Sequence, residues 1–166
     1  MILGIGIDLV DCAALSEQLA QPGSVFLSRV FTAREWRTLA SRLEEKHGLS
    51  FQMGDPLPSA AVPHLAARWA AKEAVVKAWS GALYGMSPPL AAEEVDWREI
   101  EVIHDHWQRP ALRLHGRFAE SVRHSLQDRV ATVDRLRWHL SLSHDGPHAI
   151  AYVVLEAATG GLGKDE

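Results

Sequence analysis

The alanine-rich segment LAARWAAKEAVVKAWSG, residues 65–81, constrains the fold of this chain more than any other stretch. Alanine has the highest intrinsic helix propensity, so the segment predicts a helix over roughly residues 64–80 that ends at Gly81. Its small side chains suit burial against another element. At about 100° per residue, one stripe of this helix carries Trp69, Glu73, Val76 and Ser80. A helix suited to burial therefore presents a carboxylate among apolar side chains.

Two explanations of Glu73 fit this pattern. Lys77 lies four residues further on, so the two charges could form an ion pair on a solvated face, worth about 0.2–0.5 kcal/mol. Alternatively, Glu73 is a metal-binding carboxylate and Lys77 is placed to bind phosphate. The second explanation accounts for the apolar surroundings, because a buried carboxylate is costly unless it is paired or bound to a cation.

Asp8 raises the same question at the N-terminus. It lies near the end of a strand predicted over residues 2–10, in which Gly4 and Gly6 indicate close approach of another backbone or of a ligand. Asp8 is either an exposed strand-end residue, a cap for the following helix, or a partner of Glu73. Two carboxylates from different elements are the usual protein share of a Mg²⁺ site, whose other ligands are water and substrate phosphates.

The remaining pattern mixes helices and strands without strict alternation. It predicts an α+β fold in which a largely antiparallel sheet packs against the long alanine-rich helix. Thr32 and Glu35 form a capping-box pattern at the start of one of the helices. Further helices are expected over residues 11–21, 31–46 and 116–130, strands over 97–105, 109–116, 135–144 and 148–156, and a loop over 47–63.

The composition excludes several classes of protein. The net charge of −4 over 166 residues argues against broad nucleic-acid binding. The single cysteine, Cys12, cannot form an intrachain disulfide. The apolar N-terminus has no basic region and is interrupted by Asp8 and Asp11, so it is a poor signal peptide. No apolar run approaches the ~20 residues of a membrane span. We expect a cytoplasmic protein with no membrane partner.

Several weaker motifs carry little chemistry by themselves. His144 ends a predicted strand, and Ser143, His144 and Asp145 are adjacent, so their side chains alternate in direction and cannot form a hydrolase triad. The pair His104 and His106 lacks a clear third ligand for zinc. No glycine-rich phosphate loop is present, which argues against an ordinary kinase or NAD enzyme.

Taken in order, the motifs resemble one family. The segments GIGIDLV, FTAREW, AARWAAKEAVVKAWSG, RPALRLHG and HLSLSHDGPHAIAYVVLE together are similar to holo-[acyl-carrier-protein] synthase, the small single-domain type of 4'-phosphopantetheinyl transferase. The resemblance covers residues 1–156 as one domain, with 47–63 as a loop insertion, and leaves 157–166 as a frayed tail. It implies the fold of these transferases.

The resemblance also implies a reaction. The phosphopantetheine arm of coenzyme A would be transferred to a serine of apo acyl carrier protein in fatty acid biosynthesis, releasing adenosine 3',5'-bisphosphate. Asp8 and Glu73 would bind Mg²⁺, with Glu73 and Lys77 as catalytic residues and either Glu73 or a metal-bound water as the base. The residues expected to contact coenzyme A are Arg68, Lys72, Lys77, Arg109, Pro110 and His144. Arg68 and Lys72 could equally form a solvated basic edge.

Small members of the family usually form homotrimers with active sites at subunit interfaces, and Arg109 and Pro110 match a segment that reaches the nucleotide of a neighbouring subunit. Family members often carry several arginines on the first helix, facing the acidic carrier. The first predicted helix here has none. The carrier could instead dock on basic residues further along, namely Arg29, Arg34 and Arg37, with Arg42 nearby.

Two alternatives remain open from the sequence. A trimeric module that binds coenzyme A without transfer would keep the basic residues but would not need both Asp8 and Glu73. A Mg²⁺-dependent pyrophosphatase acting on coenzyme A would share every catalytic residue named above. Only a product assay with a carrier protein separates the pyrophosphatase from the transferase.

Overall fold

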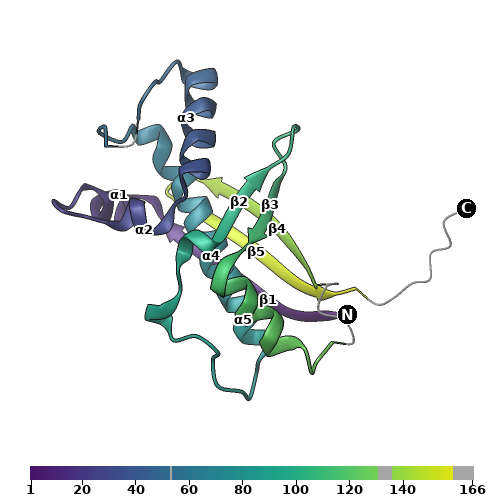
Figure 1. Cartoon of the computed structure of the whole chain (residues 1–166). Helices are drawn as coiled ribbons and strands as arrows, with labels where there is room; N and C mark the ends of the chain where they lie inside the picture. The colour runs from purple at the N-terminus through teal and green to yellow at the C-terminus, as the bar shows by residue number, and fades with distance from the viewer. Residues whose placement is uncertain (53, 131–135, 159–166) are drawn as a thin grey trace, which may run out of the picture.

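The long helix α4 (Val62–Ala82) lies across one face of a three-stranded sheet, and the rest of the chain is arranged around this pair (Figure 1). The computed structural model describes residues 1–52, 54–130 and 136–158. Strands β1 (Ile2–Asp11), β5 (His148–Ala157) and β4 (Leu136–Asp145) form an antiparallel sheet in the order β1-β5-β4. The expected α+β fold, with an antiparallel sheet against the alanine-rich helix, is confirmed.

Two glycines bring α4 unusually close to β1. A Cβ atom added at Gly4 would collide with the backbone of Ala78, and one added at Gly6 would collide with the backbone of Ala74. Since Ala74 and Ala78 are themselves fully buried, small residues face each other on both elements. The expectation that these glycines mark the close approach of another backbone is confirmed.

The side chains of β1 divide cleanly between its two faces. Gly4, Gly6 and Asp8 are buried. Ile5, Ile7 and Leu9, which alternate with them, are each at least half exposed. The strand is therefore buried on one face only. Successive side chains of a strand point to opposite faces, so the isoleucines lie on the side away from α4.

A helical lobe covers the N-terminal half of α4. It consists of α1 (Cys12–Ala20), α2 (Phe26–Val30) and α3 (Ala33–His47). The capping box of Thr32 and Glu35 is present at the start of α3, as expected. The short α2 was not anticipated from the sequence. Of the expected loop, the described residues 48–52 and 54–58 are irregular, and η1 (Ser59–Ala61) follows. Helix α4 begins two residues earlier than predicted.

A hairpin and one helix complete the fold. Strands β2 (Ile100–His104) and β3 (Pro110–Leu114) pair in antiparallel fashion, and β3 lies beside β4. Helix α5 (Gly116–Leu126) packs on α4, where Trp79 Nε1 donates to Ser125 Oγ at 2.9 Å. The short helices η2 (Ala92–Glu94) and η3 (Trp97–Glu99) precede the hairpin. None of the helices in the described part of the chain is both long and apolar enough to cross a membrane.

The expected tail is only partly described. Ala157 ends β5 and bonds to Met1, so the sheet extends one residue beyond the expected boundary. Residues 159–166 lie outside the described residues.

Candidate active site

Asp8 and Glu73 come together where β1 crosses α4. Asp8 lies on the same face of β1 as Gly4 and Gly6, so its buried carboxylate points toward the helix. Glu73 is half-buried, on a stripe of α4 that also carries the half-buried Val76 and the exposed Ser80. Burial raises the pKa of Glu73, and the charge of the neighbouring Asp8 raises it further. The pairing of the two carboxylates, left open by the sequence, is present in the structure.

Lys77 joins the same cluster one turn along α4. Its Nζ lies 2.6 Å from Asp8 Oδ1, and about half of its side chain is exposed. Lys77 lowers the pKa of Glu73, opposing the effects of burial and of Asp8. The ion pair that the sequence suggested between Glu73 and Lys77 is instead formed by Lys77 with Asp8. The lysine keeps an exposed face through which a phosphate oxygen could approach.

This donor set fits a magnesium ion. Mg²⁺ is commonly bound through one or two carboxylates and completes its shell with water and substrate phosphates, which is what Asp8 and Glu73 offer. Burial and the charge of Asp8 raise the pKa of Glu73, and a divalent cation bound between the two carboxylates would favour their charged forms. Within the described residues no group of three or more His, Cys, Asp or Glu side chains is placed to hold a metal, so the His104 and His106 zinc hypothesis has no support.

Arg68 lies five residues before Glu73 on α4, about 140° around the helix from it, and has unused hydrogen-bond donors. Its Nη1 donates to the carbonyl oxygen of His64 at 3.0 Å, but Nε and Nη2 are buried and have no partner among the described residues. Its side chain is only 3 % exposed, and burial lowers its pKa to about 10, against the attraction of Glu35. Buried donors without acceptors are rare in folded proteins, so Arg68 is suited to an anionic ligand.

Two further residues near Arg68 were not expected from the sequence to bind coenzyme A. Arg42, from α3, also has a buried Nε without a partner, and His104 at the end of β2 has an unpartnered Nδ1. Burial, with repulsion from Arg68 and Arg42, lowers the pKa of His104 to about 4. Arg42 lines an open cavity of about 730 Å³ on α3, together with Arg37 and Lys46. No spacing in the sequence joins these residues, because three different elements bring them together.

The structure corrects the assignment of Lys72. Lys72 is fully buried, and its Nζ donates to Glu35 Oε2 at 3.0 Å and to the carbonyl oxygens of Trp97 and Ile100 at 3.0 and 2.6 Å. Burial lowers its pKa, although Glu35 opposes that effect. All three ammonium protons have acceptors within the chain. Lys72 therefore joins α4 to α3 and to the start of β2, and it is not available to coenzyme A.

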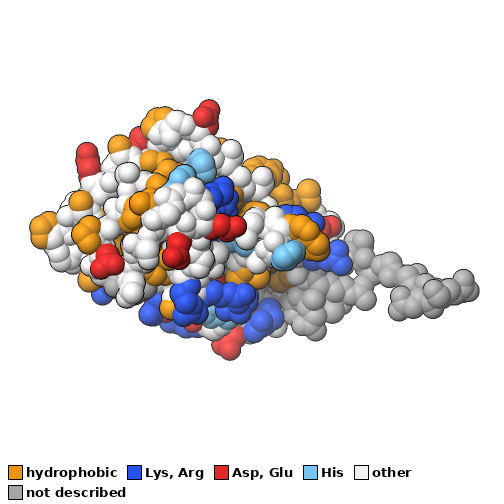
Figure 2. Space-filling model, turned by 90° about the horizontal axis from the view of Figure 1, so that it is seen from above, with side chains coloured by type: hydrophobic (Ala, Val, Ile, Leu, Met, Phe, Trp, Pro, Cys, Tyr) orange, Lys and Arg blue, Asp and Glu red, His pale blue; other side chains and the backbone are white. Residues whose placement is uncertain are grey.

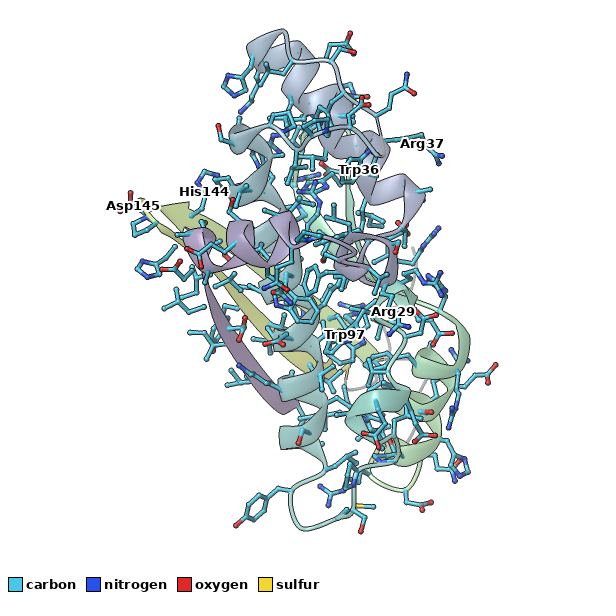
Figure 3. The ribbon with its side chains drawn as sticks, turned by 90° about the vertical axis from the view of Figure 1, so that its left-hand side faces the viewer. Arg29, Trp36, Arg37, Trp97, His144 and Asp145 are labelled. Atoms are coloured by element: carbon cyan, nitrogen blue, oxygen red, sulfur yellow. The ribbon has the colours of Figure 1, made fainter. Side chains whose placement is uncertain are left out.

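The other expected contacts of coenzyme A lie at the edges of the molecule. His144, labelled in Figure 3, is exposed at the end of β4. The centroid of its ring lies 5.6 Å from that of the His64 ring, and the two ring planes are at 90°. Arg109 and Pro110 lie at the tip of the β2–β3 hairpin. The Arg109 Nε is bonded to Asp105 Oδ2 at 2.6 Å, and its guanidinium lies over the exposed Trp107 ring at 4.8 Å. Their role toward a nucleotide stays a prediction.

The three arginines expected to meet the carrier are divided between two helices. Arg29 is on α2, beside Trp97 in Figure 3, and lines a hollow with Trp69 and Trp97. Arg34 and Arg37 are exposed on α3. Figure 2 shows Lys and Arg side chains gathered along one edge of the face it presents, although the net charge of the chain is −4.

A comparison with known proteins places this site in a family. The model of the 4'-phosphopantetheinyl transferase superfamily matches residues 4–153. The chain belongs to this superfamily. The holo-[acyl-carrier-protein] synthase of Corynebacterium glutamicum (strain R) is 44% identical over 154 residues, covering 93% of this chain and 98% of the relative. That of Mycobacterium sp. (strain KMS) is 42% identical over 155 residues, covering 93% and 97%.

Solved structures of phosphopantetheinyl transferases agree with this assignment. The Chronobacterium ammoniagenes ACPS–CoA complex has a TM-score of 0.73 and 36% identity, covering 94% of this chain and 98% of that one. The Mycobacterium tuberculosis acyl carrier protein synthase has a TM-score of 0.63 and 35% identity, covering 95% and 100%. The resemblance expected from the sequence motifs, the transferase fold and the expectation of an enzyme are confirmed.

Proposed function

We propose that this protein transfers the 4'-phosphopantetheine group from coenzyme A to a serine of an apo acyl carrier protein in a Mg²⁺-dependent reaction. The products would be holo carrier and adenosine 3',5'-bisphosphate. The observation that carries the proposal is the convergence of Asp8, Glu73 and Lys77 at the crossing of β1 and α4. The relative from Chronobacterium ammoniagenes is a complex with coenzyme A, which supports the donor.

Each of these residues would have a role that follows from its position along α4. Lys77 supplies a cation beside the diphosphate, where charge builds on the bridging oxygen as it leaves. Arg68, five residues before Glu73, has two N–H groups without a partner, and these would bind another phosphate of the same coenzyme A molecule. Mg²⁺ held by Asp8 and Glu73 would neutralise the diphosphate and orient it. Most of the catalysis would come from this positioning and electrostatic stabilisation.

The serine hydroxyl must lose its proton as the new bond to phosphorus forms. Either Glu73 or a water bound to the Mg²⁺ would accept it, because these are the candidate bases beside the diphosphate. His144 lies toward the other end of α4, against His64, and is assigned to contact with coenzyme A.

We further propose a homotrimer with active sites at its interfaces. The exposed face of β1 carries Ile5, Ile7 and Leu9, and Tyr152 on β5 lies directly opposite Ile7. A contiguous apolar face on an outer strand is unusual for a monomer, and a second copy of the chain would cover it. Assembly would also allow the hairpin tip with Arg109 and Pro110 to reach a neighbouring site.

The carrier and the cellular setting complete the proposal. Arg29 is the arginine placed in a hollow with Trp69, one turn from Glu73, and it would meet the carrier first, with Arg34 and Arg37 as outer contacts. The carrier would serve fatty acid biosynthesis in the cytoplasm, where the half-buried thiol of Cys12 would stay reduced.

The test is intact-mass spectrometry of apo acyl carrier protein incubated with this protein, coenzyme A and Mg²⁺. We expect a gain of ~340 Da, one phosphopantetheine arm, that disappears when EDTA removes the metal. Glu73→Gln should lose the gain, whereas the exposed carboxylate change Glu93→Gln should keep it. Cleavage of coenzyme A without any mass gain on a panel of carriers would replace the transferase by the pyrophosphatase.

A further inference from the structure

An apolar pocket that the proposed transfer does not use lies between the last turns of α4 and the segment of residues 83–95. The volume of this α4-end pocket is about 290 Å³. Its walls include the buried side chains of Trp79, Leu83 and Leu90, and Trp79 Nε1 already donates to Ser125 Oγ at 2.9 Å. None of the residues that line it, all of them in the described part of the chain, is charged. The walls are therefore suited to a hydrocarbon.

The fold shapes the pocket before any ligand arrives, because the chain leaves the end of α4 and returns beside it (Figure 1). Gly85 has a φ of +85°, which favours glycine, and it turns the chain after the helix. Pro88 and Pro89 follow, and neither has an N–H group to donate to a carbonyl oxygen of the helix. Leu90 is buried in the core and anchors the returning segment. A preformed pocket costs little conformational entropy on binding.

A guanidinium group lies at the rim of the α4-end pocket. Arg129, which follows α5, is exposed, and its Nη1 donates to the Ala82 carbonyl oxygen at 2.7 Å. Its Nη2 lies 3.4 Å from the sulfur of Met86, which lines the pocket. A thioether sulfur is a weak acceptor, whereas a carboxylate can accept two charge-assisted hydrogen bonds from one guanidinium. A carboxylate at the rim would therefore replace a poor acceptor of Arg129 by a good one.

We propose that the α4-end pocket binds a medium-chain fatty acid, with the hydrocarbon chain against Trp79 and Leu90 and the carboxylate on Arg129. The uncharged walls select the chain, and the guanidinium at the rim selects an anion over an alcohol of the same length. A methylene group is close in size to a water molecule, which takes up ~30 Å³, so the pocket has room for about eight to ten carbons. This binding site does not depend on the transferase function proposed above.

The test is isothermal titration calorimetry of the full chain, without coenzyme A or carrier, with sodium decanoate below its micelle concentration. Butyrate and decanol are the comparison ligands. Each methylene that enters an apolar pocket favours binding by about fourfold, so butyrate should bind more than about a hundredfold more weakly than decanoate. Decanol keeps the chain but loses the carboxylate, so it should bind about tenfold more weakly.

Two variants fill the pocket from its exposed rim. Ser80→Phe on α4 and Ala92→Phe on η2 should each abolish the binding of decanoate. Ser87→Phe is the matched control, because Ser87 is exposed on the same segment but does not line the pocket. Two variants on different elements guard against the misfolding of either one.

Variants of Arg129 test the charged end of the site separately. Arg129→Met should lower the affinity for decanoate to that for decanol and leave the affinity for decanol unchanged. Arg129→Lys keeps a cation at the rim and should keep part of the preference for decanoate. Arg123→Met removes another exposed arginine, from α5, and should bind both ligands as the parent does.

Methyl NMR spectra locate the bound chain. Signals of Leu83, Leu90 and Val95 should shift when decanoate is added. Those of Ile5 and Ile7, on the exposed apolar face of β1, should stay in place. The pocket would be established by binding that is lost in both rim variants and kept in Ser87→Phe.

Three results would overturn the inference. They are the absence of decanoate binding, binding that shifts the isoleucines of β1 or survives both rim variants, and equal affinities for decanoate and decanol. None of these results bears on the transferase, because the transfer of phosphopantetheine is measured without fatty acid. Loss of transfer would likewise leave the fatty acid site standing.

Discussion

Lys77 Nζ lies 2.6 Å from Asp8 Oδ1 and thereby ties the middle of α4 to the first strand. The two residues are separated by 68 intervening positions, and their contact is made possible by Gly4 and Gly6, which let the helix and the strand approach closely. The same contact leaves Glu73 facing a second carboxylate. The electrostatics of the site therefore depend on how closely the backbones pack.

Lys77→Met should reduce kcat about a hundredfold with little change in the free energy of unfolding. The lysine stabilises charge on the diphosphate, and removing one such group commonly costs 10²–10³ in rate. Because its side chain is half exposed, its ion pair with Asp8 contributes less than about 1 kcal/mol. The measurements are steady-state kinetics and urea unfolding. Arg117→Met, which removes an exposed cation paired with Glu94, is the control and should change neither.

Lys72→Met should instead lower the free energy of unfolding and leave the kinetics of the folded protein unchanged. Removing the ammonium leaves the buried Glu35 carboxylate without its cation, and breaking a buried pair in this way costs about 3 kcal/mol of unfolding free energy. Protein that remains folded should bind coenzyme A with an unchanged KM, because Lys72 does not face the site. A stable variant with a raised KM would restore Lys72 to the coenzyme A site.

Gly6→Ala should destabilise the protein by about 3 kcal/mol or prevent folding, because the added methyl group would overlap the backbone of α4. Gly81→Ala is the matched control. A Cβ atom at Gly81 meets nothing nearer than the Ile5 carbonyl oxygen at 3.9 Å, and alanine has the higher helix propensity. Thermal unfolding should therefore rank Gly81→Ala at or above the parent. Equal melting temperatures for the two variants would contradict the close approach of β1 and α4.

The stability of the protein should fall as the pH drops from about 7 to 4. Burial and nearby cations lower the pKa of both His64 and His104 to about 4, whereas an unfolded histidine titrates near 6.5. Between these values the unfolded state binds more protons, so the free energy of unfolding decreases as the pH falls. Allowing for partial exposure, each histidine should account for about 1 kcal/mol.

The double variant His64→Gln with His104→Gln should flatten this dependence. Urea unfolding at several pH values in that range gives the slope directly. His106→Gln, on the exposed hairpin tip, is the control and should keep the slope of the parent. An unchanged slope in the double variant would assign the acid sensitivity to other groups.

Ile7→Lys should disrupt self-association. A lysine in the middle of the exposed apolar face of β1 would have to be desolvated in any assembly through that face. Light scattering should show a trimer for the parent and a monomer for the variant, with activity lost in proportion. Tyr84→Lys changes an aromatic residue that is more exposed than Ile7 but lies elsewhere, and should remain trimeric. A parent that is monomeric and active would exclude the interfacial site.

Much of the fold follows from short-range pattern. The alanine run predicted α4 to within two residues at either end, and Thr32 with Glu35 predicted the start of α3. The alternating segments at the C-terminus predicted β4 and β5. These elements depend on helix propensity, capping and side-chain period, which act between neighbours in the chain. The short α2 has no such signal and was missed.

The roles of charged residues were harder to predict because they depend on what lies opposite. Lys72 and Lys77 are five residues apart on one helix, yet one is enclosed by Glu35 and two carbonyl oxygens while the other is half exposed beside Asp8. Glu35 has the sequence signature of a capping residue and is also the buried partner of Lys72. Arg42 is close enough to lower the pKa of Arg68 only because α3 packs against α4.

The sequence by itself determined most of the helices and strands, the candidate carboxylates and the family to which the chain belongs, because these depend on residue types and spacing. Tertiary structure decided which lysine is buried and which donors of Arg68 stay unpaired. The physical reason is that the burial and pairing of a side chain depend on the space left between the helices and strands that pack around it. That space is set by the close contact of β1 with α4, not by the distance between residues along the chain.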